Sequence, residues 1–316
     1  MSCRNGLQWG RSLMNKEFVR ACYREFDAAR LFADAPMRFH TTFRIGGPAD
    51  LLFYPKTTEE VQRIIRMARE YGEKVTLLGN GSNLLVRDGG IRGLVIQFSY
   101  KMAAVVREGT DLIIGAGALL RDAAARAQEY GLSGLEFACG IPGSIGGAIF
   151  MNAGAYDDEM KSVVVSVKTV TRNGELHLYS AEELDFGYRH SIFHGCDEAI
   201  CETRLHLHED DKALILARME DLNQRRESKQ PLSYPSAGST FKRPPGYFAG
   251  TLIDQTGLKG LTVGGAQVSQ KHAGFVINIG NATADDVQQL ISIVQKRVYA
   301  AHGVQLFPEL RIIGEA

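Results

Sequence analysis

The 316-residue sequence predicts an α+β fold with more than one domain. Strand-like runs follow one another between residues 94 and 208, whereas an alternating α/β chain would place a helix after almost every strand. Helical periodicity is concentrated near the N-terminus and after residue 212. A chain of this length usually forms about two domains and can bury a sizeable core.

The first part of the chain predicts a compact β-α-β unit. Residues 1–35 are mixed in polarity and suggest a loosely attached arm or an amphipathic helix. A strand is expected at 51–54, followed by a helix that Thr57 and Glu60 open as a capping box. The next strand, 75–78, leads into a glycine loop.

The middle part predicts short strands around one Ala-rich helix at 119–130. The dipeptide Asn173-Gly174 separates two alternating runs and is a strong hairpin signal. The expected strands are 94–98, 105–108, 112–114, 163–171, 175–179 and 199–208.

The last part begins with a charged helix at 212–229, after which the composition shifts to Gly, Ser and Pro. Apolar spacing then predicts two further helices and two strands. These are the helices 248–255 and 284–301 and the strands 275–279 and 305–313.

The bulk composition excludes several classes of protein. The 36 basic and 36 acidic residues balance, which argues against nucleic acid or an anionic membrane as the main partner. No apolar run reaches the roughly 18 residues of a spanning helix, and no signal peptide is recognisable. The five cysteines form no disulfide framework. We expect a soluble cytoplasmic protein with no obligate protein partner.

Two glycine-rich loops are the strongest functional signal. The run 138–156 has five glycines between Gly140 and Gly154, a density that permits close approach of the main chain to a phosphate. A second loop, Gly79-Asn80-Gly81-Ser82-Asn83, follows the strand at 75–78. Neither loop fits the Rossmann or P-loop pattern, so we expect a different way of cradling a dinucleotide. Tight turns in an apolar loop are the alternative interpretation.

Three further residues have side chains suited to catalysis. Ser239, in a tight turn three residues before Lys242, could donate a proton, although a solvated turn is the commoner structure. Arg189, among aromatic residues, could bind a carboxylate or phosphate. Glu309 is expected in an apolar C-terminal strand and, if buried, would need a partner.

The scattered histidines and cysteines fit no zinc module, and we expect no metal. Cys139, in the glycine-rich run, is expected to be a small buried residue and not a nucleophile.

Seven motifs in order resemble the UDP-N-acetylenolpyruvoylglucosamine reductase (MurB) family. The resemblance covers residues from about 40 to the C-terminus, and the uninterrupted passage from Tyr188 to Lys271 is closer to the shorter, type II branch. Asp157 and His194 depart from residues common in the family. The motifs are TFRIGG at 42–47, GNGSNLLV at 79–86, GIPGSIGG at 140–147, MNAGAY at 151–156, YRHS at 188–191, AGSTFK at 237–242 and Pro308-Glu309.

The resemblance implies a two-lobed FAD-binding region of the vanillyl-alcohol-oxidase (PCMH) type and a smaller α+β substrate-binding domain. It divides the chain into an N-terminal arm (1–35), FAD-binding lobes (36–93 and 94–211) and a substrate domain (212–316). It further implies non-covalently bound FAD, reduction by NADPH, and reduction of an enolpyruvyl ether to UDP-N-acetylmuramate in peptidoglycan synthesis. NADPH and the nucleotide sugar are then the partners.

Residue roles also follow from the resemblance. Ser239 would donate the proton, and Arg189 and Glu309 would support the substrate carboxylate. Tyr188, Arg226 and Lys242 would bind substrate. Cofactor contacts are expected from Arg44, Gly79, Asn80, Gly81, Ser82, Asn83, Gly140, Gly143, Ser144, Gly146, Gly147, Asn152 and Gly154.

Two other functions remain open from the sequence. One is a flavin oxidase of the same fold, although the loop at 79–83 lacks the histidine that often tethers flavin in such enzymes. The other is a non-catalytic binding module for flavin or a nucleotide sugar, which would leave Ser239, Arg189 and Glu309 unexplained.

Overall fold

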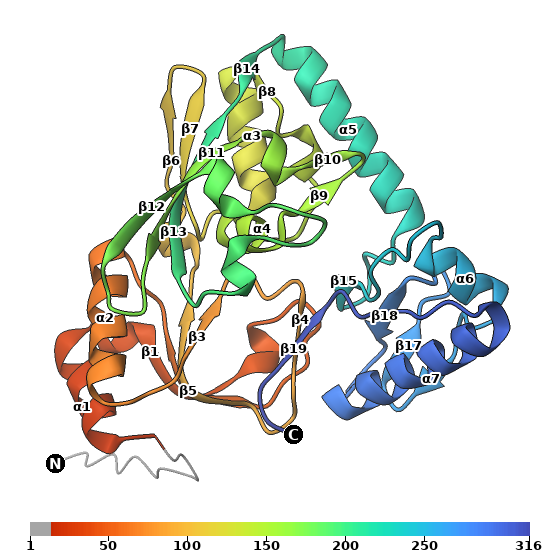
Figure 1. Cartoon of the computed structure of the whole chain (residues 1–316), viewed down its shortest axis with the longest axis horizontal. Helices are drawn as coiled ribbons and strands as arrows, with labels where there is room; N and C mark the ends of the chain where they lie inside the picture. The colour runs from red at the N-terminus through yellow and green to blue at the C-terminus, as the bar shows by residue number, and fades with distance from the viewer. Residues whose placement is uncertain (1–13) are drawn as a thin grey trace, which may run out of the picture.

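The computed structural model describes residues 14–316 and is built around three sheets (Figure 1). The first sheet has the order β1-β2-β5-β3, with β1 (Leu31–Pro36) antiparallel to β2 (Pro48–Phe53). Strands β5 (Ile91–Gln97) and β3 (Val75–Leu78) run parallel to β2, as the β-α-β prediction requires.

Two helices accompany the first sheet, α1 (Lys16–Glu25) and α2 (Thr58–Glu70). The amphipathic helix expected near the N-terminus is present in α1, but the described part of the segment is not loosely attached. Phe18 and Cys22 are fully buried, and β1, which sequence patterning missed, is the edge strand of the sheet. Residues 1–13 of the expected arm lie outside the described residues.

The capping box expected at α2 is half present. Thr57 Oγ1 accepts the N–H of Glu60, but the Glu60 carboxylate accepts the N–H of Lys56 and pairs with Arg30.

The second sheet has the order β12-β11-β13-β7-β6 and is antiparallel throughout. The predicted hairpin is confirmed, with Gly174 at φ +75° in the turn between β11 and β12. The strands are β6 (Val105–Glu108), β7 (Asp111–Gly115), β11 (Val164–Val170), β12 (Leu176–Ser180) and β13 (Ala199–His206). Nearby lie α3 (Leu120–Tyr130), α4 (Ile145–Met151) and the short strands β8 (Leu132–Ser133), β9 (Gly154–Ala155), β10 (Asp158–Glu159) and β14 (His208–Glu209).

Helix α5 (Lys212–Lys229) has the predicted bounds and connects the second sheet to the C-terminal layer (Figure 1). Asp211 caps it, and Arg218 pairs with Glu136 beneath it. The C-terminal sheet has the order β15-β18-β17-β16. Its strands are β15 (Ser236–Ser239), β16 (Thr262–Val263), β17 (Ala266–Val268) and β18 (Phe275–Asn278). The C-terminal part also contains the helices α6 (Ala249–Gln255) and α7 (Ala284–His302).

The chain then returns to the first lobe. Strand β19 (Arg311–Ile313) pairs in parallel with β4 (Leu84–Val86), directly after the first glycine loop. The strand predicted over 305–313 is therefore much shorter, and Glu309 precedes it in irregular structure. This return brings Glu309 close to the glycine loop at 79–83.

Buried side chains link these layers. One large apolar cluster joins the first two sheets, and a second contains the C-terminal elements together with Phe43, Ile45 and Leu85. Among the described residues, no helix is long and apolar enough to cross a membrane.

Candidate active site

A cavity of about 1730 Å³ lies where the three layers meet. Both glycine loops line it, together with residues of β15 and the C-terminal segment. Ligand pockets usually measure roughly 300–1,000 Å³, so this cavity has room for a large cofactor and a second ligand.

The first glycine loop is held in place by residues of other segments, which donate hydrogen bonds to its backbone carbonyls. Gln97 Nε2 donates to the carbonyl of Gly79 (3.1 Å), and Thr42 N–H donates to that of Gly81 (3.2 Å). Asn80 Nδ2 donates to the carbonyl of Pro142 in the second loop (2.6 Å). The residues that join the two loops, Asn80 and Pro142, are 62 positions apart in the sequence, and the loops therefore form one wall.

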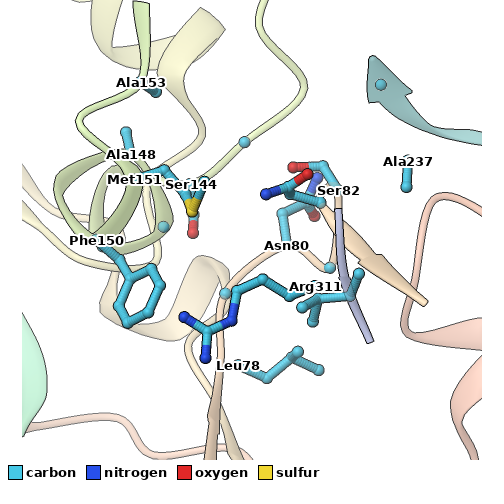
Figure 2. A pocket seen from close by; sticks show the side chains of 18 of the residues that line it. Leu78, Asn80, Ser82, Ser144, Ala148, Phe150, Met151, Ala153, Ala237 and Arg311 are labelled. Atoms are coloured by element: carbon cyan, nitrogen blue, oxygen red, sulfur yellow. The ribbon is translucent and has the colours of Figure 1, made fainter. Parts of the chain in front are cut away.

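Two features of the second glycine loop fit a cofactor cradle. The Ser144 hydroxyl is buried, faces the cavity and has no hydrogen-bond partner among residues 14–316 (Figure 2). Gly147 also lines the cavity, and a Cβ built on it meets one atom outside its helix, Ser144 Oγ at 3.6 Å. A Cβ there would therefore project into the space that a ligand would fill, as expected of glycines that let a ligand approach the main chain.

An arginine–glutamate pair lies on the wall formed by the chain return. Arg189 Nε donates to Glu309 Oε1 (2.7 Å), and Arg189 Nη2 donates to the carbonyl of Gly154 (3.1 Å). The two side chains are 22% and 12% exposed, so the pair is largely sheltered from solvent. Arg189 has five N–H donors, and those not used here remain available to a ligand. Glu309 is thus partly buried and has the partner that a sheltered carboxylate needs.

The backbone of Arg189 has φ +54°, and two other cavity residues, Arg44 (φ +55°) and Tyr156 (φ +55°), share this left-handed conformation. Such conformations are uncommon for residues other than glycine and gather at functional sites. The cluster around this cavity supports its assignment as the site.

Ser239 lines the same cavity, at the end of β15. Gly238 before it has φ +75°, and the next residue, Thr240, is fixed by a hydrogen bond from its N–H to the carbonyl of Gly274 (2.8 Å). Within the described chain the Ser239 hydroxyl has no hydrogen-bond partner. It is therefore free to donate to a ligand.

Three residues predicted for the site lie outside the wall of this cavity. Asn152 is buried, and its side chain accepts from Lys161 N–H (2.9 Å) and donates to the carbonyl of Gly187 (3.0 Å), so it positions the loop that carries Arg189. Tyr188 and Lys242 line a smaller neighbouring cavity of about 470 Å³. Lys242 therefore lines a different cavity from Ser239, its near neighbour in the sequence.

Tyr188 nevertheless connects the two cavities. Its hydroxyl lies 3.5 Å from Glu309 Oε2 and accepts the N–H of Arg243 (3.2 Å). The remaining predicted residues, Arg44, Gly79, Asn80, Gly81, Ser82, Asn83, Gly140, Gly143, Ser144, Gly146, Gly147, Gly154 and Arg226, all line the main cavity.

Arg226 reaches the cavity from α5 beside Gly140, and its Nε is buried without a partner in the described chain. Burial lowers the pKa of its guanidinium. Cys139 is also buried beside α5, and burial raises the pKa of its thiol, as expected of a packing residue and not of a nucleophile.

The cavity residues that sequence reasoning missed include Arg311 and His272. Arg311 follows Glu309 by two positions, and the buried Leu310 between them is the alternation that could have indicated it. His272 Nδ1 accepts the N–H of Gly274 (3.1 Å), which leaves the proton on Nε2, and burial lowers the pKa of this imidazole. No sequence signal separates His272 from the other histidines.

Residues 14–316 contain no group of three or more His, Cys, Asp or Glu side chains placed to hold a metal ion. His206, one of the scattered histidines, is largely exposed, and its Nδ1 lies 2.7 Å from Asp111 Oδ1.

Two family models match this chain, one in its N-terminal part and one in its C-terminal part. Residues 49–179 match the family model of an FAD binding domain. Residues 230–313 match the model described as UDP-N-acetylenolpyruvoylglucosamine reductase, C-terminal domain.

Full-length relatives give the same result. A UDP-N-acetylenolpyruvoylglucosamine reductase of Clostridium perfringens (strain SM101 / Type A) is 50% identical over 298 residues, covering 94% of this chain and 98% of the relative. The reductase of Geobacillus kaustophilus is 52% identical over 282 residues, covering 89% and 92%. The crystal structure of the reductase (MurB) from Thermus caldophilus superposes with a TM-score of 0.77 at 38% identity, covering 88% of this chain and 97% of that one.

Proposed function

The chain belongs to the UDP-N-acetylenolpyruvoylglucosamine reductase family, and on that premise we propose how its cavity carries out the reaction. It is an FAD-dependent oxidoreductase that reduces the enolpyruvyl ether of UDP-N-acetylenolpyruvoylglucosamine in peptidoglycan precursor synthesis. Its fold is α+β, with an FAD-binding region of the PCMH type and a C-terminal domain. The observation that carries the proposed mechanism is that Arg189, Glu309 and Ser239 line one cavity with both glycine loops.

The residues of the two glycine loops fit FAD and would hold it without a covalent bond. Ser144 offers an unpartnered hydroxyl, and Gly147 leaves room for close approach. When bound, FAD supplies the hydride that reduces the enolpyruvyl double bond.

Arg189 and Glu309 support the carboxylate of the enolpyruvyl group. As hydride reaches the vinyl methylene carbon, negative charge develops at the α-carbon and spreads into that carboxylate. A guanidinium held in place by Glu309 and the Gly154 carbonyl stabilises this charge without reorganising.

Ser239 donates the proton that completes the reduction at the α-carbon. A hydroxyl is a weak acid, but the carbanion it meets is far more basic, and a fixed donor can therefore quench it. The unpartnered hydroxyl at the end of β15 supports this role. Lys242 is assigned no part in this step because it lines the neighbouring cavity.

NADPH is the proposed source of electrons, and it and the nucleotide sugar are the proposed partners. Residues 36–93 and 94–211 would hold FAD and residues 212–316 the sugar nucleotide, with Arg226 near the diphosphate. Tyr188 would reach substrate from the smaller cavity. Four cysteines of the described chain are unpaired, which supports a reducing compartment such as the cytoplasm.

The test of this function is anaerobic NADPH oxidation by the purified protein with and without the enolpyruvyl sugar. We expect continuous NADPH consumption in the presence of the sugar and a single turnover without it. Continuous consumption that begins only when air is admitted, at the same rate with and without the sugar, would indicate an oxidase. No consumption at all, with flavin bound, would indicate a binding module.

A further inference from the structure

Arg311 is a cavity residue whose charge the mechanism above leaves unused. Its backbone N–H donates to the carbonyl of Asn83 (2.9 Å), which fixes the residue against the first glycine loop. Its guanidinium extends into the cavity between Phe150 and Leu78 (Figure 2). The guanidinium carbon lies 4.6 Å from the centre of the Phe150 ring.

No carboxylate of the described chain compensates this charge. Arg311 makes no ion pair or side-chain hydrogen bond with residues 14–316, and its side chain is in contact with aromatic and apolar groups. Burial lowers the pKa of the Arg311 guanidinium by desolvation. The residue also lines the open cavity, where a ligand can reach it. An arginine in this setting is suited to meet a negative charge on a ligand.

The charges of the neighbouring residues indicate which ligand charge would balance Arg311. Arg189 Nε lies 2.7 Å from Glu309 Oε1, so this ion pair contributes almost no net charge. Arg311 therefore gives this end of the cavity one uncompensated positive charge. A hydride carries two electrons and one proton, so the flavin ring gains one negative charge when it accepts one.

The position of Arg311 also favours the ring over the diphosphate of the cofactor. Glu309 and Arg311 both line the cavity while Leu310 turns into the core, so the two side chains share one wall. A flavin that reacts next to Arg189 and Ser239 must place its ring at this wall. We propose that Arg311 binds the reduced, anionic flavin ring more tightly than the oxidised ring and thereby raises the reduction potential of FAD.

The experiment is a measurement of the two-electron midpoint potential of the FAD-loaded protein and of Arg311→Met. It needs neither NADPH nor the enolpyruvyl sugar, so its outcome is independent of the proposed mechanism. Removing one charge at close range should lower the equilibrium constant for reduction at least about tenfold, which is a fall of about 30 mV for a two-electron couple. Arg311→Lys, which keeps the charge, should lose less than Arg311→Met.

The matched control is Arg225→Met. Arg225 also lines the cavity, but it is exposed on α5 and pairs with Asp221 at 2.7 Å, so its removal should leave the potential unchanged. The affinity of each apoprotein for oxidised and for reduced FAD is measured as well. If Arg311→Met retains the parent potential, or weakens both redox states of FAD equally, Arg311 is an anchor for the cofactor and the proposal is wrong. Arg311→Gln, assayed with FAD above its dissociation constant, applies the same criterion should Arg311→Met fail to fold.

Discussion

The cofactor cradle can be tested at Gly147, where the structure predicts opposite effects on binding and on stability. A Cβ at this position meets no protein atom closer than Ser144 Oγ at 3.6 Å, so Gly147→Ala should be accepted by the protein itself. Replacing a helical glycine by alanine stabilises a helix by about 0.5–1 kcal/mol. The free energy of unfolding of the apoprotein should therefore stay the same or rise.

Binding of FAD should change in the other direction. The added methyl group projects into the cavity, and an extra methyl in a close-packed contact costs about 1–3 kcal/mol. The dissociation constant of FAD should rise by roughly 5- to 150-fold. Flavin fluorescence titration of the apoprotein measures the affinity, and urea unfolding of the same apoprotein measures the stability.

Other glycines of the loops give a less clear test. A Cβ at Gly81 would strike the carbonyl oxygen of His40, and one at Gly146 would meet Ala116 Cβ at 3.0 Å, so both changes also disturb the protein. Gly195→Ala is the control, since Gly195 is outside the cavity wall and its Cβ would have its nearest contact at 3.6 Å. Unchanged FAD affinity in Gly147→Ala, or a less stable apoprotein, would refute the cradle.

Three further predictions follow from the site and its supports. The protein should be yellow, and acid precipitation should release the colour into the supernatant, where a covalent flavin would instead stay in the pellet. Arg189→Lys keeps the charge but loses the fork that contacts Glu309 and Gly154, so turnover with the enolpyruvyl sugar should fall by at least tenfold with FAD content unchanged, and near-normal turnover would remove Arg189 from the site. Burial acts to raise the pKa of Glu136, but hydrogen bonds from Gly134 N–H, Ser133 and Arg218 outweigh this and lower the pKa overall. The ionised Glu136 therefore stabilises the fold above the unfolded-state pKa of about 4.3, and this stabilisation is lost as the pH falls through the lower folded-state pKa. Urea unfolding from pH 7 to 3 should accordingly show a smaller loss of stability for Glu136→Gln than for the parent protein, and parallel curves would contradict this.

Local signals in the sequence predicted most elements of the fold. The bounds of α5 and β3 are as predicted, because a strong cap at Asp211 and a short apolar run before Gly79 mark them. The edge strand β1 was missed because its alternation is weak and its partner, β2, is what makes it a strand. The strand expected over 305–313 was too long, since Pro308 interrupts it and β19 is fixed by pairing with β4.

The site could be predicted where one segment carries its own signal and not where distant segments meet. The glycine loops are visible in the sequence because glycine itself is the signal. Lys242 is three residues from Ser239 in sequence, but the chain turns it into the neighbouring cavity. Arg311 was missed because its role depends on lacking a partner, which requires knowing that Glu309 is already paired with Arg189.

The central claim, that Ser239 supplies the proton to a substrate reduced by the flavin, is tested by separating the two half-reactions of Ser239→Ala in anaerobic stopped-flow. Flavin reduction by NADPH requires no proton on the substrate carbon and should proceed at a near-normal rate. Re-oxidation by the enolpyruvyl sugar should slow by about 10²–10⁴-fold, and Ser239→Cys should recover part of it because a thiol can also donate. If Ser239→Ala is re-oxidised as fast as the parent protein, another group is the acid, and if both half-reactions slow together, Ser239 is structural.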